Sequence, residues 1–204
     1  MAPPLRVRAF PLEHLAQRPV FTHPEGVERI DADAVEIGPG KGELLLALAA
    51  GDKNRRFAAI EVSHERFTKL VRRVKAAGLT NVQLLNGDAR VVWHHWVAPG
   101  SLEQVIALFP DPWPKRRQAF HRLITAEFLR AVAPTLKPGG EFLIKTDVAS
   151  YADGIVEEAA MVPAVQVVVD TDSDSRWQRV PTTYYERMQT AAGRAIRRLC
   201  LVRV

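Results

Sequence analysis

Residues 35–43 read Val-Glu-Ile-Gly-Pro-Gly-Lys-Gly-Glu, and this stretch sets the topology of the chain. The strand-like run 34–37 precedes three glycines, and the apolar residues 44–50 begin a helix. Glycines at such a junction allow a tight turn from strand to helix, and they let a ligand approach the backbone where a Cβ atom would clash. A Walker A phosphate loop is excluded, because Gly40-Lys41 is followed by Gly42 rather than by Ser or Thr.

Strand-like apolar runs recur through the rest of the chain and mostly alternate with helical patterns. The clearest helix is predicted over 63–77, where apolar residues fall at helical spacing, Ser63 can cap the start and Gly78 can end it. A second helix is predicted over 122–136, ended by the breaker sequence Lys-Pro-Gly-Gly at 137–140. The alternation predicts an α/β fold, a doubly wound and mostly parallel sheet with helices on both faces. The strand-like runs are 34–37, 57–62, 82–85, 105–109, 142–144 and 165–169.

The composition is that of one globular domain. Of the 204 residues, 47% are hydrophobic and 25% charged, and no apolar run is long enough to span a bilayer. We expect an irregular arm over residues 1–30, rich in proline and arginine, and a single domain over 31–204. Because no apolar signal segment follows the first arginines, a cytoplasmic protein that does not bind a membrane is expected. The lone cysteine, Cys200, lies in an apolar run, which predicts a small buried residue rather than a disulfide.

Acidic residues stand at the ends of the first three predicted strands. Glu36 lies in the first strand, Glu61 closes the second and Asp88 follows the third. In an open doubly wound sheet these positions line one crevice, and a carboxylate in the place of Glu61 can accept hydrogen bonds from ribose hydroxyls. Three acids suit a cofactor with a ribose, an adenine amino group and a methionyl ammonium better than a pyrophosphate. The plain alternative is that the acids cap helices or bind loop amides, as Asp88 could. This set resembles the class I methyltransferases.

The segment Phe109-Pro110-Asp111-Pro112-Trp113-Pro114-Lys115 follows the fourth predicted strand. Its three prolines fix the backbone around Asp111 and Trp113, and a cationic run over 115–122 suits RNA phosphates. The net charge of +5 and the pI near 9.7 favour a polyanionic partner, although so modest an excess is common in other proteins. The pattern predicts a base pocket beside a track for the RNA backbone, and Trp113 can either pack on the sheet or stack on a base.

That segment resembles the signature of the bacterial tRNA (guanine-N7-)-methyltransferases. Two further pieces are similar to motifs of the same family, Ile144-Lys145-Thr146-Asp147 and Thr183-Tyr184-Tyr185-Glu186. The resemblance implies a Rossmann-like class I fold of seven strands, the last one antiparallel over 194–204. It implies methyl transfer from S-adenosylmethionine to N7 of a tRNA guanine, the variable-loop guanine at tRNA position 46, by a monomer or homodimer without a metal.

The resemblance also assigns residues to the site. It implies cofactor contacts at Glu36, Gly38, Glu61, Asp88, Ala89 and Asp111. It implies substrate contacts at Lys115, Asp147, Thr183, Tyr184, Tyr185 and Glu186, and contacts with RNA at Arg117, His121 and Arg122. Members of the family usually carry His, Lys and Arg where this chain has Gln118-Ala119-Phe120, so this chain departs from the family pattern within the predicted RNA contacts. Thr183-x-x-Glu186 is also a capping box that would start a helix.

The chemistry expected from these residues needs no general base. Guanine N7 carries a lone pair and no proton, so methyl transfer requires alignment and stabilisation of the positive charge that develops on the purine. We assign the catalytic role to Asp111. Our hypothesis is that Asp111, helped by Asp147 or Glu186, accepts the N1–H and N2–H₂ donors of an extruded guanine.

Three other functions remain open from the sequence. Asp111-Pro112-Trp113 is similar to the loop of methyltransferases that act on exocyclic base amines, although the second consecutive proline is missing. A nicotinamide-dependent oxidoreductase could use the glycine loop, and a non-catalytic RNA-binding domain could use the charge. A cytosine C5 enzyme is disfavoured, because its nucleophilic cysteine has no well-placed counterpart in Cys200.

Overall fold

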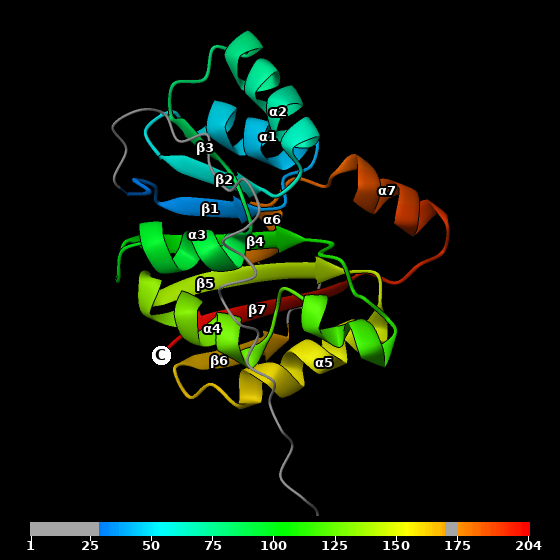
Figure 1. The fold of residues 1–204 in the computed structure, drawn as a ribbon. Helices are drawn as coiled ribbons and strands as arrows, with labels where there is room; N and C mark the ends of the chain where they lie inside the picture. Colours follow the sequence, from blue (N-terminus) through cyan, green and yellow to red (C-terminus); the bar gives the residue numbers. More distant parts are fainter. Residues whose placement is uncertain (1–28, 170–174) are drawn as a thin grey trace, which may run out of the picture.

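The computed structural model describes residues 29–169 and 175–204, which form a seven-stranded sheet in the order β3-β2-β1-β4-β5-β7-β6 (Figure 1). Strand β7 pairs antiparallel with β5 and β6, whereas every other pairing is parallel. The predicted doubly wound sheet with an antiparallel closing strand is therefore confirmed. The strands are β1 (Ala34–Ile37), β2 (Phe57–Glu61), β3 (Val82–Asn86), β4 (Leu102–Leu108), β5 (Leu136–Thr146), β6 (Val165–Val169) and β7 (Arg197–Arg203).

Helices cover both faces of this sheet. They are α1 (Glu43–Gly51), α2 (His64–Ala76), α3 (Ala89–Trp96), α4 (Ala126–Val132), α5 (Ala149–Ala160), α6 (Ser175–Gln178) and α7 (Tyr184–Ala191), with 3₁₀ helices η2 (Arg116–His121) and η3 (Ala133–Thr135). Within the described ranges, no helix is both long and apolar enough to span a membrane.

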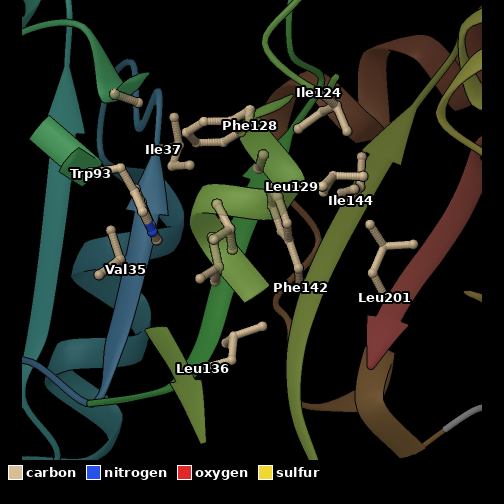
Figure 2. Packing of buried hydrophobic residues seen from close by; sticks show 14 of the residues in the cluster. Val35, Ile37, Trp93, Ile124, Phe128, Leu129, Leu136, Phe142, Ile144 and Leu201 are labelled. Atoms are coloured by element: carbon tan, nitrogen blue, oxygen red, sulfur yellow. The ribbon is translucent and has the colours of Figure 1, made fainter. Parts of the chain in front are cut away.

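The alternation of side chains along the strands determines which helices pack on which face. Val35 and Ile37 of β1 point to the face covered by α3, α4 and α5, which lie in front of the sheet in Figure 1. Figure 2 shows them beside Trp93 of α3 and near Phe128 of α4. Trp93 meets the Phe128 ring edge-on, and its indole N–H donates to the Thr135 hydroxyl at 3.1 Å, so this large core side chain has its polar atom paired.

The opposite face carries the even-numbered residues of β1. Ala34 packs with Leu45 and Ala49 of α1 and with Leu70 of α2. Further along the sheet, Cys200 packs with Leu44 and Trp177 and is fully buried, which confirms the prediction made for it. Glu36 points to this same face, so its carboxyl group lies beneath α1.

The helix predicted over 122–136 is wrong in its boundaries. The 3₁₀ helix η2 ends at His121, before this range, and α4 begins only after Thr125, whose hydroxyl accepts from the Phe128 N–H at 3.2 Å. Pro134 then ends α4 because it lacks the N–H that the next helical bond requires. The sequence 137–140 also continues β5, with a register shift against β4. A Cβ atom on Gly140 would lie 2.8 Å from the Lys137 carbonyl oxygen, so only glycine is accommodated at this irregularity.

Other predicted boundaries hold more closely. Ser63 caps α2 by accepting from the Arg66 N–H, as its position suggested. Strand β7 begins at Arg197 and ends at Arg203, so it is slightly shorter than the predicted 194–204. Of the predicted arm over 1–30, residues 1–28 lie outside the described residues. Ile30 is buried, and its N–H donates to the Trp96 carbonyl at 2.8 Å, so this point of the chain already belongs to the packed domain.

Candidate active site

A pocket of about 290 Å³ opens at the carboxyl edge of the sheet, where parallel strands end together. It brings together several of the residues predicted from the sequence, from both the cofactor half and the substrate half: Gly38, Glu61, Asp88, Ala89, Asp111 and His121. Trp113, Phe109, Val62 and Arg66 also line it. The other predicted residues, which are Glu36, Lys115, Arg117, Arg122, Asp147 and residues 183–186, do not line this pocket.

The glycine loop is built by positive backbone angles that favour glycine. Gly42 has φ +72° and forms the N-cap of α1, and a Cβ atom placed there would clash with Leu70 Cδ1. Glu61 holds this loop from the end of β2. Its Oε2 accepts from the Gly40 N–H at 3.1 Å, and its Oε1 accepts from the Ser63 N–H at 2.9 Å. Each carboxylate oxygen has a further lone pair, so Glu61 can still accept from a ligand in the pocket.

Glu36 is buried with one oxygen left unpaired. The carboxyl group accepts from the Leu45 N–H in the first turn of α1, whereas Oε2 has no hydrogen-bond partner. Burial above all, and then the nearby charge of Glu61, raise the pKa of Glu36 to about 8 against the effect of the Leu45 N–H. A buried, unsatisfied carboxyl oxygen two residues before Gly38 is suited to an ammonium group, which would pair with it and restore its charge.

Asp88 performs the capping role that the sequence left open. Its Oδ1 accepts from the backbone N–H of Arg90 at 2.9 Å and from Arg90 Nε, and its Oδ2 accepts from Arg90 Nη2 at 2.6 Å. Asp88 also lines the pocket. Its contact with a cofactor stays a prediction, because the structure shows both of its oxygens bound to Arg90.

The loop after β4 has an unusual backbone. Phe109 and Trp113 adopt φ values of +54° and +40°, which cost about 1–2 kcal/mol each for residues with a Cβ atom. Arg122 holds the loop in this shape, since its guanidinium donates to the carbonyl oxygens of Pro112 at 2.9 Å and Trp113 at 3.3 Å. The same guanidinium lies over the Tyr151 ring. Arg122 therefore supports the loop that carries Asp111, and its predicted contact with RNA stays a prediction.

Aromatic rings surround the mouth of the pocket. Trp113 packs against His121 with ring centroids 4.8 Å apart, and it also lines the pocket. The packing alternative is therefore observed, and stacking of Trp113 on a base stays a prediction. The Phe109 ring lies 4.7 Å from the Tyr185 ring of α7. Phe120 and Tyr185 are exposed, and a group of large exposed rings beside a pocket is typical of a binding surface.

The motif 183–186 is placed differently from the simple capping box. Thr183 caps α7 by accepting from the Glu186 N–H at 3.3 Å. The Glu186 carboxylate is buried and accepts from Lys145 and Arg198. Asp147 accepts from Arg194 at 2.7 Å, so a cation already neutralises part of its charge.

Two contacts that fix α7 were not predicted from the sequence. Glu43, at the end of the glycine loop, accepts from the Tyr184 N–H at 2.6 Å and from Arg187 at 3.2 Å, which ties α7 to the start of α1. No local pattern signals a contact between residues 141 positions apart. Lys145 belongs to the motif at 144–147, but its burial was not predicted. A lysine that follows three apolar residues of a strand is the signal that would have indicated it.

Within the described ranges, no group of three or more His, Cys, Asp or Glu side chains is arranged to hold a metal ion. The chemistry of the pocket is that of carboxylates, aromatic rings and backbone amides. An acid pair beside a glycine loop, opposite a rigid loop that carries a third acid, can hold a cationic adenosyl cofactor next to a flat, electron-rich acceptor.

Comparisons with known proteins agree with this arrangement. Residues 31–199 match a family model described as "Putative methyltransferase". The tRNA (guanine-N(7)-)-methyltransferase of Nocardioides sp. is 43% identical over 178 residues, which are 87% of this chain and 70% of that protein. The protein of the same name from Cutibacterium acnes is 34% identical over 173 residues, covering 83% of this chain and 62% of its own length. Among solved structures, TrmN from Thermus thermophilus has a TM-score of 0.58 at 17% identity, covers 95% of this chain and 47% of that one, and supports the fold alone.

Proposed function

The chain belongs to the tRNA (guanine-N7-)-methyltransferase family, and we propose that it transfers a methyl group from S-adenosylmethionine to N7 of a guanine in tRNA. The observation that carries this proposal is the pocket at the carboxyl edge of the sheet. One wall is the glycine loop with Glu61, and the other is the strained loop with Asp111 and Trp113. A methyl donor and an acceptor base bound on these two walls would lie next to one another.

The residues of the first wall, together with Glu36 buried beneath α1, fit the cofactor. S-adenosylmethionine supplies a methyl group on a positively charged sulfonium. Glu61 offers carboxylate oxygens to the ribose hydroxyls, and Glu36 offers its unpaired Oε2 to the methionyl ammonium. Gly38 and Ala89 bring only backbone and a small side chain to the pocket, which leaves room for the adenosyl group. We propose these residues, with Asp88, as the cofactor site.

The second wall is proposed to read the guanine. Asp111 is exposed and lines the pocket, and Arg122 fixes the loop around it. A carboxylate at this position accepts the N1–H and N2–H₂ donors of guanine together, whereas adenine does not offer this pair of donors. It also stabilises the positive charge that the purine acquires. Of the three acids suggested by the sequence, Glu186 is buried against Lys145 and Asp147 is paired with Arg194, so Asp111 is the strongest candidate.

We propose contacts with the rest of the tRNA from exposed residues that follow the same loop. Lys115 and Arg117 are exposed next to the pocket and are suited to phosphates on either side of an extruded guanine. Gln118-Ala119-Phe120 places the exposed Phe120 ring against His121, where it offers stacking in place of charge. We propose the variable-loop guanine at tRNA position 46 as the target and a cytoplasmic location, where tRNA is available. A monomer and a homodimer are both compatible with this site.

The test is transfer of a labelled methyl group to two unmodified tRNAs that differ only at the target position. The tRNA with guanine in the variable loop should be labelled, and the tRNA with adenine there should not. Equal labelling of both would reject the proposed position, and labelling of neither would reject tRNA as the substrate. Calorimetry with S-adenosylhomocysteine and with NAD(H) separates the cofactor assignment from the RNA assignment, because the proposal requires binding of the first alone.

A further inference from the structure

Lys145 is a buried lysine near the end of β5, with only 2% of its surface exposed. An ammonium group at such a position is costly unless it is paired. Its Nζ donates to both carboxylate oxygens of Glu186, at 3.0 and 2.8 Å, and it also lies 5.1 Å from the centre of the Trp177 ring. This ion pair connects the sheet to α7, the helix that carries Tyr184 and Tyr185.

The backbone of Lys145 holds the opposite wall of the pocket. Its carbonyl oxygen accepts from the Phe109 N–H at 2.8 Å, at the point where Phe109 takes its positive φ and the loop with Asp111 begins. The Phe109 and Tyr185 rings then meet 4.7 Å apart. One residue thus contacts both elements whose aromatic rings come together at the mouth of the site.

Glu186 is poorly placed to touch a base itself. Its side chain is 3% exposed, and besides Lys145 it accepts from Arg198 at 3.0 Å. A carboxylate that is buried and shared by two cations has little capacity left for a further donor. The same contacts fix the helix on which Glu186 stands.

We propose that Lys145 is a positioning residue for the guanine site: through Glu186 it docks α7 against the loop 109–114, so that Tyr185 and Phe109 together form one wall of the base site. Glu186 acts in this assignment by holding α7 and does not contact the guanine. The inference rests on the proposed function for the identity of the base, whereas the docking of α7 is independent of it.

The test compares single and paired replacements of the two charges. Lys145→Met and Glu186→Met each leave one charge buried without its main partner, whereas the Lys145→Met/Glu186→Met double variant replaces the pair by apolar side chains of similar length. In that variant Arg198, whose side chain is 19% exposed, loses its contact with Glu186. Glu157→Gln, at an exposed position of α5, is the control for removal of a glutamate charge.

Three quantities are measured for each variant: kcat/KM for tRNA, affinity for S-adenosylhomocysteine, and hydrogen exchange of the α7 amides. Each single variant should lose at least about tenfold in kcat/KM and exchange α7 amides faster, while affinity for S-adenosylhomocysteine stays within about twofold. The double variant should recover kcat/KM to within about threefold of the wild type and restore slow exchange. The control should match the wild type in all three quantities.

Two results would overturn the proposal. If the double variant regains slow exchange but keeps the defect of Glu186→Met in kcat/KM, Glu186 contacts the base directly. If the single variants keep wild-type kcat/KM, the pair does not position the site. Failure of the proposed function is recognised separately, because the wild type would then form no 7-methylguanosine even though the exchange data on α7 behave as described.

Discussion

Replacement of Glu36 by glutamine should stabilise the protein without ligand, and the gain should depend on pH. The pKa of Glu36 is raised from an ordinary 4.5 to about 8, chiefly by burial beneath α1. Between these two pH values the folded protein holds a proton that the unfolded chain has released, so the free energy of unfolding falls as pH rises through this window. At 1.36 kcal/mol per pKa unit the full shift corresponds to about 5 kcal/mol.

Glutamine removes this destabilisation because it stays neutral at every pH while keeping an oxygen for the Leu45 N–H. The two proteins should therefore differ least near the ordinary pKa of 4.5. Above the raised pKa the variant should gain up to roughly 10–20 °C in Tm relative to the wild type, at about 2–4 °C per kcal/mol for a domain of this size. Thermal unfolding of both proteins across this range measures the difference. A Tm difference that does not change with pH would contradict the raised pKa of Glu36.

Binding of the cofactor should also depend on Glu36, but it should favour the ionised carboxylate, whereas the folded protein without ligand favours the neutral acid. An ammonium bound to Oε2 requires the ionised form of Glu36, so binding of S-adenosylhomocysteine at neutral pH should release close to one proton. Calorimetry in two buffers with different ionisation enthalpies detects that proton. Glu36→Gln should bind more weakly and release none. Equal proton release by both proteins would contradict the assignment of Glu36 to the ammonium.

Further predictions concern the two walls of the pocket. Asp111→Asn should lower kcat/KM for tRNA by about 100-fold and weaken the preference for guanine over adenine, since it replaces an acceptor of two donors by one acceptor and one donor; wild-type selectivity would exclude the role given to Asp111. Arg122→Met should free the strained loop and lower kcat by about 10- to 100-fold. Arg117→Met should mainly raise KM for tRNA and reduce the dependence of this KM on salt. If Arg122→Met changed KM and its salt dependence while Arg117→Met changed kcat, Arg122 would bind RNA and would not hold the loop. Gly42→Ala should destabilise the protein by about 2–4 kcal/mol in denaturant unfolding, because it places a Cβ atom at φ +72° against Leu70, and an unchanged midpoint would show that the loop has another backbone conformation.

The glycine-loop wall of the pocket is predicted well from the sequence because the position of that wall follows from periodicity. A parallel sheet brings the ends of its strands to one edge, so Glu61 and Asp88 had to lie near the glycine loop once the strands were assigned. The antiparallel position of β7 followed only from the resemblance. Such positions depend on strand pairing between distant parts of the chain, which local patterns do not determine.

The partners of individual charges could not be predicted. Glu186 was expected to help read the substrate, but it pairs with Lys145, 41 residues away, because two elements that are distant in sequence pack together there. Asp88 and Arg122 were assigned to ligands, and in the structure they bind Arg90 and the loop 112–113. The role of residues 137–140 was also incompletely predicted: the proline and glycines expected to break a helix form an irregularity within β5.

The most direct test of the proposed methyl transfer is to identify the nucleoside that the protein makes. Unmodified tRNA is incubated with the protein and S-adenosylmethionine and is then digested to nucleosides. Mass spectrometry against authentic methylated standards identifies the modified nucleoside. We expect 7-methylguanosine, formed by the wild type and strongly reduced in Asp111→Asn. A nucleoside methylated on an exocyclic amine, or no methylated nucleoside at all, would contradict the proposal.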